Sequence, residues 1–166
     1  MKQLITSLAI VLLSAEAAMA DTITVAPGES IQAAIDLAGA GDVVELSAGS
    51  WQEHLIIPDH AFTLRGAIDK LGLPASSVDG GADRAMTIEN NMKGVEFEHL
   101  VVSGQHPNTG GGVYLYRSNS SFINCRFENC HAEGTSTHDG GGAIYRRDGV
   151  FHLPFAVLRS RGGGRG

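Results

Sequence analysis

The sequence is poor in aromatic side chains, in cysteine and in long hydrophobic runs. Its 166 residues include six Phe, three Tyr and one Trp, against 22 Gly and only two Cys. This scarcity disfavours one bulky core, and two cysteines alone are too few for a structural metal site. After position 20, no apolar stretch approaches the roughly 20 residues that a membrane-spanning helix needs. The apolar content comes from Val, Ile, Leu and Ala, which suits thin stacked layers.

Positive charge is scarce in most of the chain. Residues 21–145 carry 16 Asp and Glu against 6 Lys and Arg, a net charge of -10. Residues 146–166 carry five Arg and one Asp, a net charge of +4. Because the body is acidic, we do not expect it to bind nucleic acid.

The segment 1–20 has the pattern of an export signal. Lys2 supplies a short positive region, positions 4–13 are almost wholly apolar, and Ala18-Met19-Ala20 is a small-x-small cleavage site. The pattern predicts a signal peptide at 1–20 and a mature chain that begins at Asp21 and forms one domain. We therefore expect a secreted or periplasmic protein, or one held at the cell surface.

One short helix and a series of short strands are predicted after the signal. Ser30 suits the N-cap of a helix near 30–38, and Gly39 suits its C-terminal end. The apolar residues of that segment recur at helical spacing: Ile31, Ala34, Ile35 and Ala38. The predicted strands are bounded by Gly, Pro, Asn, Asp or Ser: 22–25, 42–47, 51–57, 62–65, 85–89, 94–102, 113–116 and 121–127.

A glycine-rich unit occurs twice near the end of the chain, as GGGVYLY from Gly110 and as GGGAIY from Gly140. A repeat at this spacing indicates a solenoid, in which like positions of successive coils stack. Alignment of the two units predicts that Leu115 lies over Tyr145. The helix is expected to cover the apolar end and the unpaired strand of the first coil.

Several segments of the chain resemble a known family. VAPGESIQAAIDLAGAGDVVELSAGSWQEHLII, FTLRGA, SVDGG and GVEFEHLVVSG are similar to the N-terminal part of right-handed parallel β-helix proteins of the pectin-lyase-like superfamily. The two glycine units, with SSFINCRFENCHA between them, resemble repeats of polymorphic outer-membrane proteins. The resemblance covers roughly 22–145. It implies an all-β fold over 21–145, a right-handed parallel β-helix with a short N-terminal capping α-helix.

Residues 146–166 depart from this pattern. They largely lack the Asn, Ser and Thr residues that separate the earlier strands, and they end in a glycine-arginine run. One interpretation is a disordered basic extension that contacts anionic surfaces. The interpretation that we favour is a coding frame that ends early, for example through a frameshift, so that the solenoid is incomplete at its C-terminus. Such an end leaves an open edge, through which self-association is expected.

Trp51, Tyr114 and Tyr116 are the candidate carbohydrate-binding residues. Tyr114 and Tyr116 share one side of a predicted strand, and Leu115 takes the other side. If Leu115 points inward, both tyrosines face solvent. They then form either a saccharide platform or amphipathic cover for a sheet.

Asp79 and Asp83, in VDGGAD, are the candidate metal ligands. Two carboxylates can hold a cation, but an aspartate beside glycine more often makes an Asx turn, which is the interpretation that we favour. A second titratable group lies in a loop rich in Gly, Ser and Thr, which favours solvated side chains: His131, Glu133, His138 and Asp139.

Cys125 and Cys130 are a candidate disulfide. Five positions of extended strand span about 16 Å, which is too far for a bridge, so a bridge requires a corner near 128–129. An oxidising compartment permits the bond, and two buried thiols are the alternative. The sequence leaves both open.

No complete catalytic motif accompanies these residues. The Trp-x-Asp-His and Arg-x-Pro-x-x-Arg motifs of β-helix lyases are absent, as are the Asn-Thr-Asp, Asp-Asp and Gly-His-Gly motifs of β-helix hydrolases. We therefore expect an exported, non-catalytic β-helix protein without a cofactor, which binds extracellular polysaccharide or a cell surface as an adhesin-like module. The alternative is the N-terminal part of a lyase, hydrolase or epimerase that acts on acidic polysaccharide, with calcium as the cation of a lyase.

Overall fold

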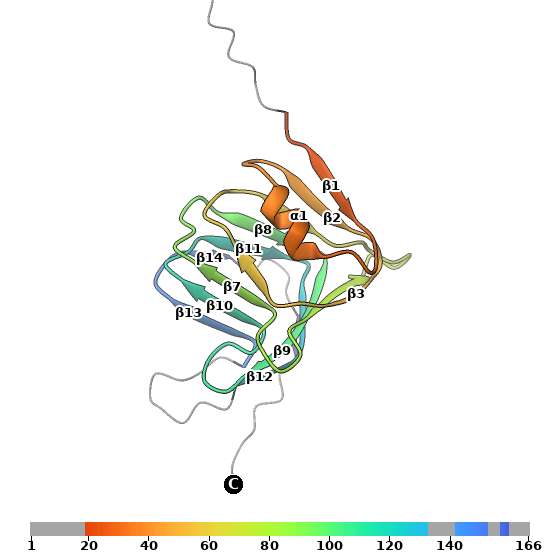
Figure 1. The fold of residues 1–166 in the computed structure, drawn as a ribbon. Helices are drawn as coiled ribbons and strands as arrows, with labels where there is room; N and C mark the ends of the chain where they lie inside the picture. Colours follow the sequence, from red (N-terminus) through yellow and green to blue (C-terminus); the bar gives the residue numbers. More distant parts are fainter. Residues whose placement is uncertain (1–18, 133–141, 153–156, 160–166) are drawn as a thin grey trace, which may run out of the picture.

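The structure is a computed structural model that describes residues 19–132, 142–152 and 157–159. Within these residues the chain is built of strands apart from one short helix, and every pairing between named strands is parallel (Figure 1). Most of the predicted signal peptide lies outside the described residues, as do Glu133, His138 and Asp139.

The strands form three sheets, and after β1 successive strands of the chain belong to these sheets in a fixed order. Sheet A contains β1 (Thr22–Val25), β2 (Val43–Leu46), β5 (Thr63–Arg65), β8 (Val95–Glu98), β11 (Ser120–Ile123) and β14 (Phe151–His152). Sheet B contains β3 (Gly49–Gln52), β6 (Ser76–Asp79), β9 (Leu100–His106), β12 (Arg126–Ala132) and β15 (Val157–Arg159). Sheet C contains β4 (Leu55–Ile57), β7 (Met86–Glu89), β10 (Val113–Tyr116) and β13 (Ile144–Arg147). The order A, B, C repeats from β2 onward, so the fold is an all-β, parallel and solenoid-like arrangement, as the sequence predicted.

Three predicted strands are each divided in the structure: 51–57 is split between β3 and β4, and left-handed corner residues divide the other two. His99 separates β8 from β9, and Asn124 separates β11 from β12, with φ angles of 57° and 49°. A left-handed residue turns the chain sharply, so each predicted strand continues in the next sheet. The two corners lie against each other, because the amide nitrogen of Asn124 is 3.0 Å from Nδ1 of His99. Strand β6 was not predicted as a strand.

The core consists of apolar residues stacked from coil to coil. Leu64, Phe97 and Phe122 occupy paired positions on β5, β8 and β11, and all three are fully buried. The rings of Phe97 and Phe122 are stacked, with centroids 4.6 Å apart. Because each inward position repeats above the previous one, a narrow column of side chains replaces a single bulky core.

The predicted helix is confirmed as α1 (Ile31–Leu37). The Ser30 hydroxyl accepts a hydrogen bond from the Ala33 N–H at 3.2 Å, which is the N-cap contact. The buried side of the helix packs against β1, β2 and β4, and Figure 1 shows it beside β1 and β2. At its C-terminal end Ala38 is extended and Gly39 is not left-handed, so Gly39 is not a left-handed cap. In the part of the chain that the structure describes, no helix is long and apolar enough to cross a membrane.

The predicted alignment of the two glycine units is wrong by one position. Tyr114 pairs with Tyr145, and Leu115 pairs with Arg146. A shift of one position moves a side chain to the opposite side of a sheet. Tyr145 therefore lies on the outer side of sheet C beside Tyr114, and does not stack on the buried Leu115.

The strand pattern continues beyond Tyr145, into the segment that was expected to depart from the repeat. Strand β13 ends at Arg147, and β14 and β15 pair with β11 and β12. The parallel order of the sheets therefore extends to Arg159.

Candidate functional site

The outer side of sheet C gathers the side chains that the sequence analysis selected, together with others. Leu115 is 1% exposed and points inward, whereas Tyr114 and Tyr116 are half-buried on the outer side. Tyr114 lies between Thr87 of β7 and Tyr145 of β13. Aromatic residues from two successive coils thus meet on this side.

The tyrosine rings are oriented with their flat faces against neighbouring groups. The rings of Tyr114 and Tyr145 are nearly parallel, with centroids 5.6 Å apart and an angle of 7° between the planes. The guanidinium carbon of Arg84 lies 4.7 Å from the centroid of Tyr114. Because Arg84 precedes β7 and Tyr145 is on β13, these two groups approach Tyr114 from opposite directions along the sheet. A sugar ring therefore has no free face of Tyr114 to stack on, and the hydroxyl edge is the part that remains available.

Two more arginines lie over the ring of Tyr116. The guanidinium carbons of Arg117 and Arg147 are 5.5 Å and 5.9 Å from the centroid of Tyr116. These distances are within the range of cation–π attraction. We call the group formed by the three arginines and three tyrosines the tyrosine–arginine face: Arg84, Arg117, Arg147, Tyr114, Tyr116 and Tyr145.

Arg84 is the most unusual member of this face. It is only 8% exposed, and burial lowers the pKa of its guanidinium below the usual value. Among the described residues no hydrogen bond or ion pair reaches the guanidinium. Arg84 is thus a nearly buried cation whose guanidinium lies on the ring of Tyr114.

Asp79 and Asp83 hold the loop that carries Arg84. A side-chain oxygen of Asp79 accepts from the Gly81 N–H at 2.9 Å, which is the contact of an Asx turn. One oxygen of Asp83 accepts from the Arg84 N–H at 2.8 Å, and the other is 3.4 Å from Nδ1 of His54. No group of three or more His, Cys, Asp or Glu in the described ranges is arranged to hold a metal ion. The Asp79 contact is that of an Asx turn, whereas Asp83 contacts the Arg84 N–H and His54 of another coil.

The same loop is fixed from both sides. Gly80 donates to the Ser103 carbonyl at 2.9 Å, and the Gln105 N–H donates to the Asp83 carbonyl at 2.8 Å. The other nitrogen of His54 is 2.9 Å from the hydroxyl of Thr87. Neighbouring coils therefore hold the backbone of Arg84 in the position from which its side chain contacts Tyr114.

Trp51 does not contribute to this surface. It is 4% exposed, and its indole N–H donates to the Glu29 carbonyl at 3.0 Å. Because the ring is buried between the helix entry and the first coil, it cannot present a flat face to a sugar. In the structure, Trp51 therefore does not lie with the tyrosines among which the sequence analysis placed it.

Cys125 and Cys130 are both free, buried thiols in the structure. Their sulfurs contact different carbonyls of the preceding coil, those of Phe97 and Val102, each at 3.4 Å. Burial raises the pKa of each thiol to about 12. Strand β12 is irregular between the two cysteines, where Asn129 has a φ of 51°.

His131 lies at a small hollow beside the Arg84 loop. The hollow has a volume of about 200 Å³ and is lined by Ala82, Gln105, His106, Pro107 and His131. Nδ1 of His106 accepts from the backbone N–H groups of Asn108 and Thr109, at 3.3 Å and 3.2 Å. Burial lowers the pKa of His106, so its imidazole is held in the neutral form.

Sequence reasoning missed the arginines of the tyrosine–arginine face and also Tyr145. A signal was present, because both glycine units end in a Tyr-Arg pair, Tyr116-Arg117 and Tyr145-Arg146. Arg84 had a weaker signal, as the one basic residue next to the turn that precedes β7. Nothing in the sequence shows that its guanidinium lies on Tyr114. No protein-family model matches this chain, and comparisons with curated proteins and with solved structures gave no significant match.

Proposed function

We propose that this protein is an exported, non-catalytic surface module that binds acidic polysaccharide through the tyrosine–arginine face. The proposal includes a right-handed parallel β-helix of the pectin-lyase-like kind, with α1 as the cap of its first coil. The parallel order of the sheets and the packing of α1 on β1, β2 and β4 support this architecture. The side chains on sheet C support the choice of ligand.

The observation that carries the proposal is the burial of the Arg84 cation against the ring of Tyr114. A nearly buried cation that has no ion-pair partner among the described residues is costly, since burial removes water from the charged group. A carboxylate ligand would satisfy the guanidinium with charge-assisted hydrogen bonds, which are often bidentate. The ring of Tyr114 holds the guanidinium plane in place for this contact.

The arrangement along the sheet suits a chain with repeated acidic groups. Arg84 lies at the β7 side of Tyr114, and Arg147 is on β13. Since β7 and β13 are two strand spacings apart, the cations are spread over about 10 Å. A polymer that engages several of them gains affinity through effective concentration. Uronate residues supply both the carboxylates and the hydroxyls that such a face can bind.

Binding to polygalacturonate, alginate and uncharged dextran, measured by affinity electrophoresis, tests the proposal. We expect retardation by the acidic polymers and none by dextran. The change Arg84→Gln should weaken acidic-polymer binding about 30-fold or more, since it removes a desolvated charge contact. Lys70→Gln is the matched control, because it removes the same charge from an exposed loop position and should change binding less than twofold. Equal binding by Arg84→Gln and wild type, or equal retardation by dextran, would contradict the proposal.

One observation favours the alternative that the chain is part of a polysaccharide-degrading enzyme. His54 lies between Asp83 and Thr87, next to the loop of Arg84, so a titratable imidazole is near a cation that would neutralise a uronate carboxylate. The same polymers, incubated with the protein with and without calcium, decide between the two functions. Formation of an unsaturated product that absorbs ultraviolet light would favour a lyase, and its absence favours the binding module.

A further inference from the structure

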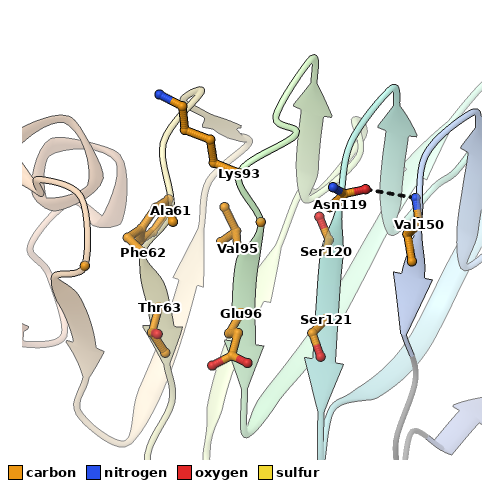
Figure 2. Close-up of a pocket in the computed structure, with 12 residues that line it drawn as sticks. Ala61, Phe62, Thr63, Lys93, Val95, Glu96, Asn119, Ser120, Ser121 and Val150 are labelled. Atoms are coloured by element: carbon orange, nitrogen blue, oxygen red, sulfur yellow. Dashed lines mark hydrogen bonds between the residues drawn. The ribbon is translucent and has the colours of Figure 1, made fainter.

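A second hollow lies on sheet A, away from the tyrosine–arginine face of sheet C. It has a volume of about 580 Å³, and its walls come from the beginnings of β5, β8 and β11 and from the loop before β14 (Figure 2). We call it the sheet A groove. The residues that matter most in it are Thr63, Lys93, Val95, Glu96, Ser120 and Ser121.

Three polar side chains form a row along the groove. Thr63 pairs with Glu96, and Glu96 pairs with Ser121, so the three lie on consecutive strands about 4.8 Å apart. Figure 2 shows their side chains next to one another. In the part of the chain that the structure describes, no hydrogen bond or ion pair occupies these side chains. The row therefore offers hydroxyl, carboxylate and hydroxyl groups to a ligand.

Ser120 also lies in the wall of the groove, but on the buried side of β11. It is 6% exposed, and its hydroxyl oxygen is enclosed and has no hydrogen-bond partner among the described residues. Buried hydroxyl groups normally have a partner, because an unpaired one loses its hydrogen bonds to water. The neighbouring Asn119 does not supply it, since its amide oxygen accepts from the Val150 N–H at 3.0 Å, the contact drawn in Figure 2. Because this oxygen is enclosed, a ligand in the groove does not reach it, so the row of Thr63, Glu96 and Ser121 carries the proposal.

The charge of the groove differs from that of the tyrosine–arginine face. Its walls carry one cation, Lys93, and one anion, Glu96, so they are neutral overall. Apolar surface is supplied by Val150, which is exposed, whereas Phe62 and Val95 are buried beneath the groove. A site with both donors and acceptors, apolar patches and no net charge suits a polyhydroxylated, uncharged molecule, because sugar rings combine hydroxyl edges with C–H surfaces.

We propose that the sheet A groove binds an uncharged glycan chain that runs across the strands, parallel to the direction in which the coils stack. The groove extends from Gly41, beside the first coil, to Val150, across strands β5, β8 and β11. Gly41 precedes β2 and Val150 precedes β14, and these strands are four strand spacings, or about 19 Å, apart, so several sugar units fit along the groove. The site is separate from the acidic-polysaccharide site, and its existence does not depend on that site.

Titration calorimetry of the full chain with neutral hexasaccharides tests the proposal. The probes are linear hexamers of glucose, mannose and xylose, and polygalacturonate is the acidic comparison. We expect wild type to bind at least one neutral hexamer. Glu96→Gln should weaken this binding about tenfold, as expected for loss of a hydrogen bond to a charged acceptor, and Ser121→Ala should also weaken it.

Two control variants separate this site from the other one. Glu45→Gln makes the same charge change at an exposed position of β2 on sheet A, outside the groove, and should leave neutral-glycan binding unchanged. Arg84→Gln should weaken polygalacturonate binding only. Because Glu96 is exposed, Glu96→Gln is expected to fold as wild type. The proposal fails if no neutral hexamer binds at millimolar concentration, or if Glu96→Gln binds as tightly as wild type. It also fails if polygalacturonate displaces the neutral hexamer from Arg84→Gln.

Discussion

Replacing Gly80 by alanine is expected to disturb both the stability of the fold and the position of Arg84. A Cβ atom at Gly80 would meet the backbone of Asp83 and Arg84 at well under 3.0 Å, closer than real Cβ contacts. Gly80 is not one of the glycines with positive φ, so alanine is penalised by lack of space and not by its backbone conformation. The backbone that would have to move is the part that carries the Arg84 side chain.

The size of the effect follows from the contacts of the loop. Carbon atoms pack at about 3.5–4.0 Å, so the two segments must separate by more than about 1 Å. The movement is resisted by the hydrogen bonds from Gly80 to Ser103 and from Gln105 to Asp83, at 2.9 Å and 2.8 Å. Overpacking of this kind costs about 1–3 kcal/mol. For a domain of this size, the unfolding midpoint should fall by about 2–12 °C.

Thermal unfolding by circular dichroism and affinity electrophoresis on polygalacturonate measure the two effects of Gly80→Ala. Gly72→Ala is the control, because Gly72 has a φ of 77° and open space around the added Cβ. That variant should lose about 1–2 kcal/mol through its left-handed backbone and keep its binding. If Gly80→Ala unfolds and binds as wild type does, the loop yields without cost, and the reasoning that it positions Arg84 is refuted.

Two further predictions concern the cysteines and the register of sheet C. Because burial raises the pKa of Cys125 and Cys130 to about 12, only about one thiol in ten thousand is ionised at pH 8. A thiol reagent should leave the native protein unmodified and label two thiols per chain in denaturant; rapid native labelling, or no labelling in denaturant without reductant, would contradict the structure. Paired positions lie within disulfide range, so Tyr114→Cys with Tyr145→Cys should form a bridge on oxidation. The pair Leu115→Cys with Tyr145→Cys should not, and the opposite result would restore the alignment predicted from the sequence.

The short repeating elements could be predicted from the sequence because their signals are local. Ser30 and the apolar residues that follow it specify α1, since capping and helical spacing involve only nearby residues. The strand 113–116 and the inward direction of Leu115 follow from alternation along one strand. The outward direction of Tyr114 and Tyr116 therefore also follows from the sequence.

The register between coils could not be predicted, because loop lengths vary from one coil to the next. Tyr114 of β10 pairs with Thr87 of β7 and with Tyr145 of β13, and these two partners lie at unequal distances from it along the chain. Aligning the glycine units therefore gave a register that was wrong by one position, and it placed Tyr145 on Leu115. Only the packed sheets show that Tyr145 lies on Tyr114. The surface aromatic cluster is thus a product of tertiary structure.

The sequence by itself determined the parallel strand-rich architecture, the helix and which side chains of the strand 113–116 point inward, because spacing and turn residues act over a few positions. Only the tertiary structure decided that Trp51 is buried, that Arg84 is a nearly enclosed cation, and that Thr63, Glu96 and Ser121 form one row. These properties depend on contacts between residues that are far apart in the sequence. The burial of a side chain, its contacts and the register between strands are decided only when the coils stack. The two candidate sites therefore belong to the fold and not to any one segment of the chain.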